Sequence, residues 1–295
     1  MAQKITPHLW YDREAVEAAE FYVDAFGEES VVRHVNRIRD TPSGDCDVVG
    51  FTLLGFDFMA ISAGPHFRFT PAISFHARYP GAAAVEAAWE KLIPGGKALM
   101  PLGEYPFAAR FGWLEDRYGL SWQIIQTRDE PIGQRIVPAL MFTGDAAGKA
   151  EKAAAFYSTL FGGAGPNVLM RYGADDVPDR EGTVRFGEVE LAGMKFAVMD
   201  SAHPHGFGFN EAVSLLVSCE GQDEIDRYWT ALSAVPEAEQ CGWLKDRFGV
   251  SWQITARRMG EWMASGDRAV ADRVTQAFLK MKKIDIVALE AAAKA

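Results

Sequence analysis

Two kinds of polar side chain recur at matched positions of this chain, and their chemistry makes them candidates for a site. His66 and His205 each follow a proline and precede a stretch rich in phenylalanine. A histidine changes charge near neutral pH, so this pair can act as acid–base groups or as a gate at a pocket mouth. Anchoring a tight turn would produce the same recurrence, so both interpretations stay open. Gln123 and Gln253 each lie in a Ser-Trp-Gln-Ile sequence, and we expect these hydrogen-bonding amides to line a pocket.

The recurrence extends to whole segments of the chain. Residues 112–125 (GWLEDRYGLSWQII) return as residues 242–255 (GWLKDRFGVSWQIT), and residues 5–11 (ITPHLWY) return as residues 136–142 (IVPALMF). The matches keep their order along the chain. A repeat this long indicates a duplicated domain, because a solenoid repeats roughly every 20–50 residues.

Within each copy, the hydrophobic periodicity predicts the same order of elements. A short strand leads into an amphipathic helix that stops at Gly27 in the first copy and at Gly162 in the second. Three strands are expected near residues 31–39, 48–54 and 56–62, and again near 168–171, 183–191 and 195–200. The order then restarts with a strand (72–78; 212–219), a helix (82–92; 222–232) and further strands, the last at 121–126 and 251–256. Each copy is therefore expected to contain two βαβββ modules.

The repeat divides the chain into residues 1–130, residues 131–260 and a C-terminal helical tail of residues 261–295. The tail has no counterpart after the first copy. The linker at 127–135 is short, so we expect the copies to pack together as an internal pseudo-dimer. Gly119 and Gly249 occupy a D-x-x-G turn before the last strand of each copy, where we predict a positive φ.

These features resemble the PhnB-like family, whose label is 3-demethylubiquinone-9 3-methyltransferase domain, within the glyoxalase/bleomycin resistance/dioxygenase (vicinal oxygen chelate) superfamily. The resemblance rests on the paired modules, the helix ending FYxxxFG (21–27; 156–162), the close CGWLKDRFGVSWQI (241–254) and the helical tail. It covers nearly the whole chain. It implies an α+β fold in which the eight strands of each copy form an incomplete barrel around a cup that binds metals or small ligands.

The enzymes of this superfamily hold a divalent metal with His and Glu side chains on the first, fifth and last strands. By this resemblance the first copy offers His8, His76 and Gln123, and the second offers Ala139, Leu216 and Gln253. A set of neutral ligands binds a divalent ion weakly, because no charge offsets the desolvation of the ion. We therefore expect no stoichiometric metal and no other cofactor, with a divalent metal open as an alternative in the first copy only. The ligand-binding candidates are His8, His66, Ser74, His76, Gln123, His205, Ser214 and Gln253.

Composition narrows the class of partner. The formal net charge of −10 argues against nucleic acid and anionic membranes, because affinity for phosphate depends on Lys and Arg. No apolar run is long enough to span a membrane, and the first residues lack the apolar region typical of a signal peptide, so we expect none. The three cysteines form no CxxC pair, so we expect a protein of the reducing cytoplasm.

Two other patterns have structural interpretations. The glycine-rich residues 161–166 follow a helix, whereas a dinucleotide-binding loop follows a strand and opens a helix. We interpret them as a helix stop. Four tryptophans at matched positions are expected in the core rather than in a stacking platform; they are Trp113, Trp122, Trp243 and Trp252.

The sequence leaves several functions open and decides neither the reaction nor whether there is one. The first is the binding of a small organic molecule in a cup without a strong metal centre. The second is a metal-dependent enzyme of the glyoxalase or dioxygenase kind, acting in the first copy. The third is a resistance protein that sequesters a toxic compound. The methyltransferase of the family label is disfavoured, because no strand–GxGxG–helix segment is present to hold S-adenosylmethionine.

Overall fold

A computed structural model describes residues 3–128, 131–264 and 266–295, so Asp129 and Glu130 of the expected linker lie outside the described residues. The first copy contains β1 (Ile5–Tyr11), α1 (Ala15–Phe26), β2 (Val31–Thr41), β3 (Gly44–Leu53), β4 (Phe56–Ser62), β5 (Ile73–Tyr79), α2 (Ala82–Leu92), β6 (Lys97–Tyr105), β7 (Ala108–Glu115) and β8 (Ser121–Gln126). The second copy contains β9 (Ile136–Phe142), η1 (Gly144–Ala146), α3 (Ala150–Phe161), β10 (Asn167–Arg171), β11 (Val184–Leu191), β12 (Met194–Asp200), β13 (Val213–Cys219), α4 (Gln222–Leu232), η2 (Pro236–Ala238), β14 (Trp243–Lys245) and β15 (Ser251–Ala256). The tail forms α5 (Arg257–Ala264), α6 (Arg268–Phe278) and α7 (Ile286–Lys294). The expected α+β fold class with C-terminal helices is confirmed.

The two modules of each copy belong to different sheets. A seven-stranded sheet has the order β14-β15-β13-β1-β4-β3-β2, and an eight-stranded sheet has the order β10-β11-β12-β9-β5-β8-β7-β6. The copies meet where β1 pairs antiparallel with β13, and again where β5 pairs antiparallel with β9. We call the seven-stranded sheet sheet A and its concave face cup A, and the eight-stranded sheet sheet B and its concave face cup B. Each cup therefore combines one module from each copy, a pairing that differs from the expected incomplete barrel of eight strands within one copy.

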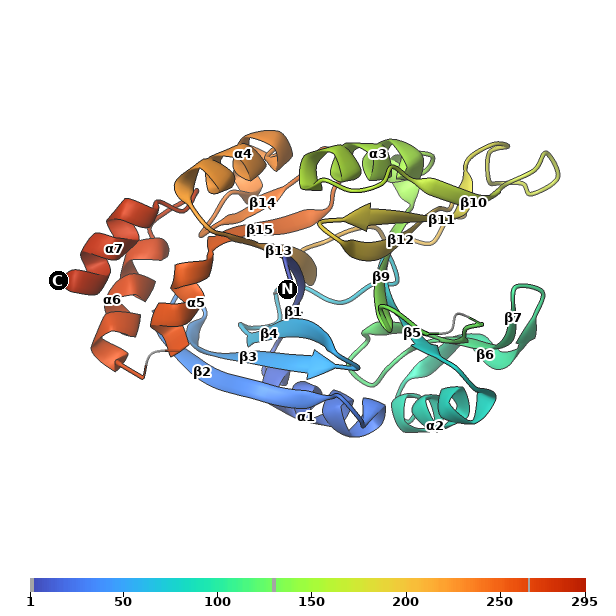
Figure 1. Cartoon of the computed structure of the whole chain (residues 1–295), viewed down its shortest axis with the longest axis horizontal. Coiled ribbons are helices and arrows are strands. Elements are labelled where there is room, and N and C mark those ends of the chain that lie inside the picture. The colour runs from blue at the N-terminus through green and yellow to red at the C-terminus, as the bar shows by residue number, and fades with distance from the viewer. Residues whose placement is uncertain (1–2, 129–130, 265) are drawn as a thin grey trace.

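Figure 1 shows how this exchange arranges the molecule. The helices α1 and α2 of the first copy lie along the lower side, and α3 and α4 of the second copy lie along the upper side. Sheets A and B stand between these helices, with their concave faces turned toward the two ends of the molecule. The convex faces of both sheets bury one shared hydrophobic core.

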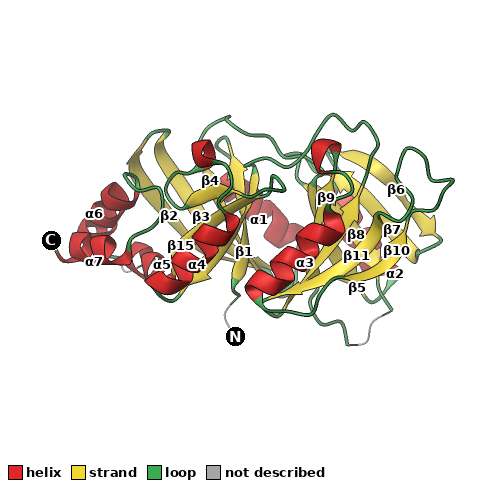
Figure 2. Cartoon of the chain, turned by 90° about the horizontal axis from the view of Figure 1, so that it is seen from above, coloured by secondary structure: helices red, strands yellow, loops and turns green. Residues whose placement is uncertain are grey.

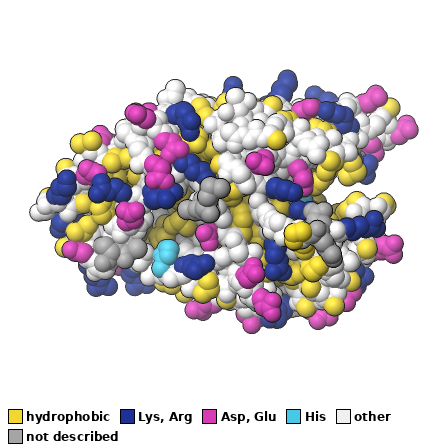
Figure 3. Space-filling model, in the orientation of Figure 1, with side chains coloured by type: hydrophobic (Ala, Val, Ile, Leu, Met, Phe, Trp, Pro, Cys, Tyr) yellow, Lys and Arg dark blue, Asp and Glu magenta, His cyan; other side chains and the backbone are white. Residues whose placement is uncertain are grey.

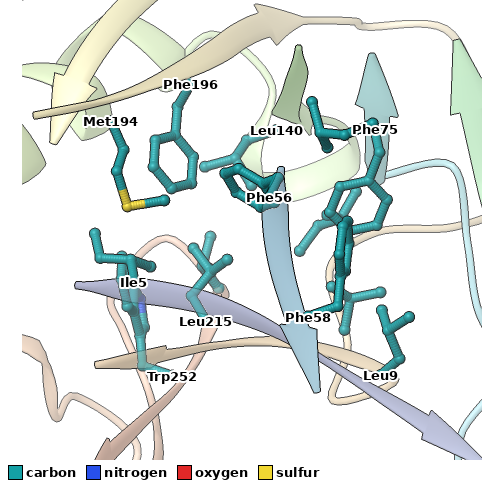
Figure 4. Packing of buried hydrophobic residues seen from close by; sticks show 14 of the residues in the cluster. Ile5, Leu9, Phe56, Phe58, Phe75, Leu140, Met194, Phe196, Leu215 and Trp252 are labelled. Atoms are coloured by element: carbon teal, nitrogen blue, oxygen red, sulfur yellow. The ribbon is translucent and has the colours of Figure 1, made fainter. Parts of the chain in front are cut away.

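That core joins both sheets and both copies. Phe58 on β4 and Phe75 on β5 face each other across the gap between the sheets, with ring centroids 5.1 Å apart (Figure 4). Trp122 packs against both rings, and Trp252 and Leu215 extend the same cluster into the second copy. Burial of this apolar surface is the main favourable term that holds the sheets back to back.

Helix α1 shows how the sequence pattern produces this packing. Its buried residues are Ala15, Ala18, Ala19, Tyr22, Ala25 and Phe26, which form one stripe at helical spacing. The helix ends at Gly27, whose φ of 69° lies in the left-handed region that favours glycine. Helix α3 repeats this design and ends at Gly162, also with a φ of 69°.

The D-x-x-G turn before the last strand is anchored by a buried carboxylate. In the first copy, Asp116 accepts hydrogen bonds from the hydroxyl of Tyr22 (2.8 Å) and the indole of Trp122 (2.9 Å), and also from two backbone amides of its own turn. Burial raises the pKa of Asp116 to about 6, although these hydrogen bonds oppose the shift. The φ values of Gly119 and Gly249 are 85° and 92°, so the predicted positive φ is confirmed at both glycines.

The second copy lacks a counterpart of β6 in the described residues, which is why sheet A has seven strands. The segment between α4 and β14 is too short for a hairpin and forms η2 instead. The tail takes the free edge: the amides of Cys241 and Gly242 donate hydrogen bonds to the carbonyls of Met281 and Lys282. Figure 2 shows α5, α6 and α7 together at one end of the molecule, beside sheet A.

No helix among the described residues is long and apolar enough to cross a membrane.

Candidate functional site

Strand β5 sends its polar side chains into cup B. Phe75 and Ala77 are buried in the shared core, so the alternation of a strand places Ser74, His76 and Arg78 on the concave face. This face encloses a cleft of about 540 Å³, and Figure 3 shows the recess between two projecting lobes on the right-hand side of the molecule. The volume lies within the range of small-molecule sites.

Both copies line the cleft. The first copy contributes His76, Arg78, Glu104, Tyr105, Pro106, Phe107, Ala108, Ala109, Ile125, Gln126, Thr127 and Arg128, and the second contributes Val137, Leu169, Phe186 and Glu188. The walls are largely apolar and aromatic. Besides the phenol of Tyr105, the ionisable groups on the described walls are two arginines, two glutamates and one histidine.

His76 is the most deeply buried polar group of this cleft. Its side chain is 9% exposed, and its Nε2 has no hydrogen-bond partner among the described residues. Burial and, to a smaller extent, the positive charge of Arg78 lower the pKa of His76 to about 4, although a hydrogen bond with Gln123 opposes both effects. The imidazole is therefore neutral at physiological pH. It lies parallel to the ring of Phe186 from the other copy, with centroids 6.1 Å apart.

Gln123 lies beside His76 in the sheet, but it does not reach the cleft. The two residues are register partners on β8 and β5, and Nε2 of Gln123 donates a 2.9 Å hydrogen bond to Oγ of Ser74. Gln253 and Ser214 repeat this bond at 2.9 Å in cup A. Neither Gln123 nor Ser74 belongs to the lining of the cleft. The glutamines and serines therefore form a polar layer beneath the cup surface.

Cup A holds a different histidine. His8 on β1 is buried, its Nδ1 has no partner among the described residues, and burial lowers its pKa to about 4. Its ring meets the edge of Trp243 at a centroid distance of 5.7 Å. Helix α5 continues directly from β15, and α6 lies beside β2 at the opposite edge of sheet A. The tail thus spans the two edges of cup A, whereas the described residues place no comparable helix at the edges of cup B.

The candidate ligand set of the first copy is not brought together. His8 lies in sheet A, while His76 and Gln123 lie in sheet B, because the two modules of one copy belong to different sheets. Each cup instead combines one histidine with one glutamine: His76 with Gln123, and His8 with Gln253. Among residues 3–128, 131–264 and 266–295, no group of three or more His, Cys, Asp or Glu side chains is placed to hold a metal ion. The donor set of neither cup fits the metal of the superfamily enzymes.

The repeated loop histidines do not line the cleft. His66 is exposed and meets the ring of Trp10 at 6.1 Å, at the border of cup A. His205 forms a 2.7 Å hydrogen bond with Oγ of Ser201, and burial lowers its pKa. Their contacts differ, so the shared loop position does not create a shared site.

The tryptophans divide into two pairs. Trp122 and Trp252 are fully buried in the core, as expected. Trp113 and Trp243 are half-buried on β7 and β14, where they are register partners of Gln123 and Gln253 and so share the concave face. The expectation of core positions is wrong for this second pair. The sequence also gave no signal for Phe186 and Glu188, because their role depends on the pairing of modules from different copies.

The fold and its paired cups define a glyoxalase-like protein, and comparisons with known proteins specify the family. The profile of the family described as 3-demethylubiquinone-9 3-methyltransferase matches residues 3–125 and again residues 134–255. These matches include most of the chain, which therefore belongs to this family. The resemblance to the PhnB-like branch of the vicinal oxygen chelate superfamily is confirmed.

Several solved structures are similar to parts or to most of this chain. A PhnB protein from Bacillus cereus, described as a 3-demethylubiquinone-9 3-methyltransferase, is 36% identical over 42% of this chain and 100% of its own, with a TM-score of 0.39. Protein PA1353 from Pseudomonas aeruginosa is 24% identical over 43% of this chain and 100% of its own, with a TM-score of 0.38. Glyoxalase I from Zea mays is 13% identical over 90% of this chain and 98% of its own, with a TM-score of 0.54, which shows a shared fold alone. No curated protein matches the chain.

Proposed function

We propose that the protein binds a small organic molecule in the cleft of cup B and that this binding needs no strong metal centre. The observation that carries the proposal is His76: its neutral imidazole lines a cleft of about 540 Å³, and its Nε2, which is enclosed by protein atoms, has no hydrogen-bond partner among the described residues. A buried polar atom without a partner costs roughly 1–3 kcal/mol, and a ligand that supplies the missing hydrogen bond recovers that cost.

The difference between the cups supports the choice of cup B. The tail spans the edges of cup A, and its carbonyls accept backbone hydrogen bonds from Cys241 and Gly242, just before β14. Cup B has a cleft between its edge strands β10 and β6, and large side chains from both copies line it.

The electrostatics of His76 favour binding over acid–base catalysis. An efficient general base has a pKa near the working pH, and a pKa of about 4 makes His76 a weak base at neutral pH. The same site suits a protein that sequesters a compound, in which no bond of the ligand changes. A metal-dependent reaction lacks a fitting donor set, and a methyltransferase lacks a nucleotide loop, since Gly162 ends helix α3.

The test is a thermal-shift comparison with benzoate, phenylphosphonate, benzylamine and 1-naphthol as probes. Leu216 occupies the position of His76 in the other copy, so His76→Leu is compatible with the fold. His8→Ala is the matched control, because Ala139 occupies the position of His8. A ligand at about one hundred times its Kd adds roughly 2.7 kcal/mol to the free energy of unfolding.

We expect at least one probe to raise the Tm of the wild type and of His8→Ala by similar amounts, and to raise the Tm of His76→Leu much less. If every probe leaves the wild-type Tm unchanged, the proposal fails. It also fails if the response is lost in His8→Ala and kept in His76→Leu.

A further inference from the structure

The walls of cup B specify the shape of a ligand. Phe186 lies flat over His76 with an interplanar angle of 13°, and Tyr105 and Phe107 stack at 25° with centroids 5.6 Å apart. The hydroxyl of Tyr105 is already donated to the carbonyl of Pro101, so this residue presents its ring to the cleft. Flat aromatic faces favour a planar partner, because stacked rings gain more than their buried area alone provides.

The rim of the cleft is apolar and exposed. Phe107, in the turn between β6 and β7, and Leu169 on β10 are each 52% exposed, and both line the cleft. In Figure 1, β10 and the β6–β7 hairpin form the two lobes on either side of the opening. Exposed apolar side chains that meet at one recess mark a binding site, because a ligand that covers them removes their surface from water.

The charges of the cleft indicate a neutral ligand. Among the described residues that line the cleft, Arg78 and Arg128 are matched by Glu104 and Glu188, so these four side chains carry no net charge. His76 adds none, since its imidazole is neutral. An anionic or cationic ligand would meet no excess of opposite charge to offset its desolvation.

The buried imidazole specifies the polar end of the ligand. A neutral histidine has one nitrogen that donates and one that accepts. With the proton on Nδ1, Nε2 of His76 is an acceptor to which a hydroxyl group can donate, whereas an ether or a carboxylate only accepts. Because Nε2 is enclosed, the ring of Phe186 beside it moves aside when the ligand binds. With the proposed function as its basis, we infer that cup B selects an uncharged, planar aromatic compound that carries a hydroxyl group directed at His76.

The experiment measures binding of four probes by calorimetry: 1-naphthol, 1-methoxynaphthalene, 1-naphthoate and cyclohexanol. We expect 1-naphthol to bind about tenfold more tightly than 1-methoxynaphthalene, a ratio that corresponds to about 1.4 kcal/mol. His76→Leu should lower the affinity for 1-naphthol to that for 1-methoxynaphthalene, while leaving the latter unchanged. Phe107→Ala should weaken both aromatic probes, and cyclohexanol should bind more weakly than 1-naphthol.

The outcomes separate this inference from the proposed function. Tightest binding of 1-naphthoate, or equal binding of cyclohexanol and 1-naphthol, overturns the ligand class. If that binding is still lost in His76→Leu, the proposed site stands and only the class is wrong. If no probe distinguishes the wild type from His76→Leu, both the inference and the proposed function fail.

Discussion

The imidazole of His76 and the ring of Phe186 lie parallel at a centroid distance of 6.1 Å, although they belong to different copies of the duplicated domain. His76 is on β5 of the first copy and Phe186 is on β11 of the second, and both line the cleft of cup B. Neither copy alone could form this contact. The site therefore requires both copies.

The buried histidine should make stability depend on pH. The pKa of His76 falls from 6.5 to about 4 on folding, so the unfolded chain binds more protons between these values and stability declines as the pH falls below 6.5. Between pH 7 and pH 5, this single group accounts for a loss of about 2 kcal/mol. We expect His76→Leu to lose about that much less than the wild type over this range, as measured by urea unfolding at both pH values.

The comparison of two proteins isolates His76 from other buried groups. Asp116 has a raised pKa and acts in the opposite direction, but it is present in both proteins and cancels. An identical pH dependence in the wild type and in His76→Leu would show that His76 is not buried in its neutral form.

The turn glycines offer a test of backbone geometry alone. Gly119 has a φ of 85°, and a Cβ added there would meet no atom within 4 Å, so backbone strain is the main expected cost of Gly119→Val. We expect a loss of about 1–3 kcal/mol in the free energy of unfolding. Gly133→Val is the matched control, since this glycine has no positive φ and an equally open surrounding. Equal losses for both variants would contradict the argument.

The repeat and its elements were predictable because they depend on local patterns. The stripe of Ala18, Ala19 and Tyr22 predicts α1, and the D-x-x-G turn predicts the φ of Gly119. These local patterns do not predict which modules pair. The alternation of buried residues in β5 and β9 is compatible with a barrel formed within one copy and with a sheet shared by both copies, because both arrangements bury the same faces.

This ambiguity explains why the candidate site was predicted only in part. His76 and Gln123 were identified from the superfamily pattern, and they are neighbours in sheet B. His8 was grouped with them because it lies in the same copy, yet β1 pairs with β13 and β4 in sheet A. Phe186 could not be recognised, since its place over His76 follows from the exchange of modules.

The shared sheets predict how the chain responds to a cut in the linker. A protease site introduced between residues 127 and 135 would divide the copies, but the pairings β1–β13 and β5–β9 and the common core would remain. We expect the two halves to sediment together as one particle of the original mass. Two separately folded halves that sediment apart would contradict the pairing of modules from different copies.

The donor sets of the cups predict weak metal binding. Protein purified without chelator should contain far less than one divalent metal per chain, and elemental analysis near one per chain would contradict this expectation. Gln123→Glu alone should change Zn²⁺ affinity little, because it would join one imidazole, its register partner His76, and the described residues place no group of three His, Cys, Asp or Glu side chains there. Combining it with Ala139→His should tighten Zn²⁺ binding at least about tenfold, since Ala139 pairs with Ser74 on the concave face and the set then contains two imidazoles and a carboxylate.

The most direct test of the cross-copy site is an NMR titration of the His76 imidazole, assigned through the signal that disappears in His76→Leu. In the wild type we expect the ring to remain neutral down to about pH 5, in line with a pKa of about 4. Phe186→Ala, a change in the other copy, should open the ring to water and move its pKa toward 6.5. A wild-type His76 that titrates near 6.5 and does not respond to Phe186→Ala would contradict a ligand cup built from both copies.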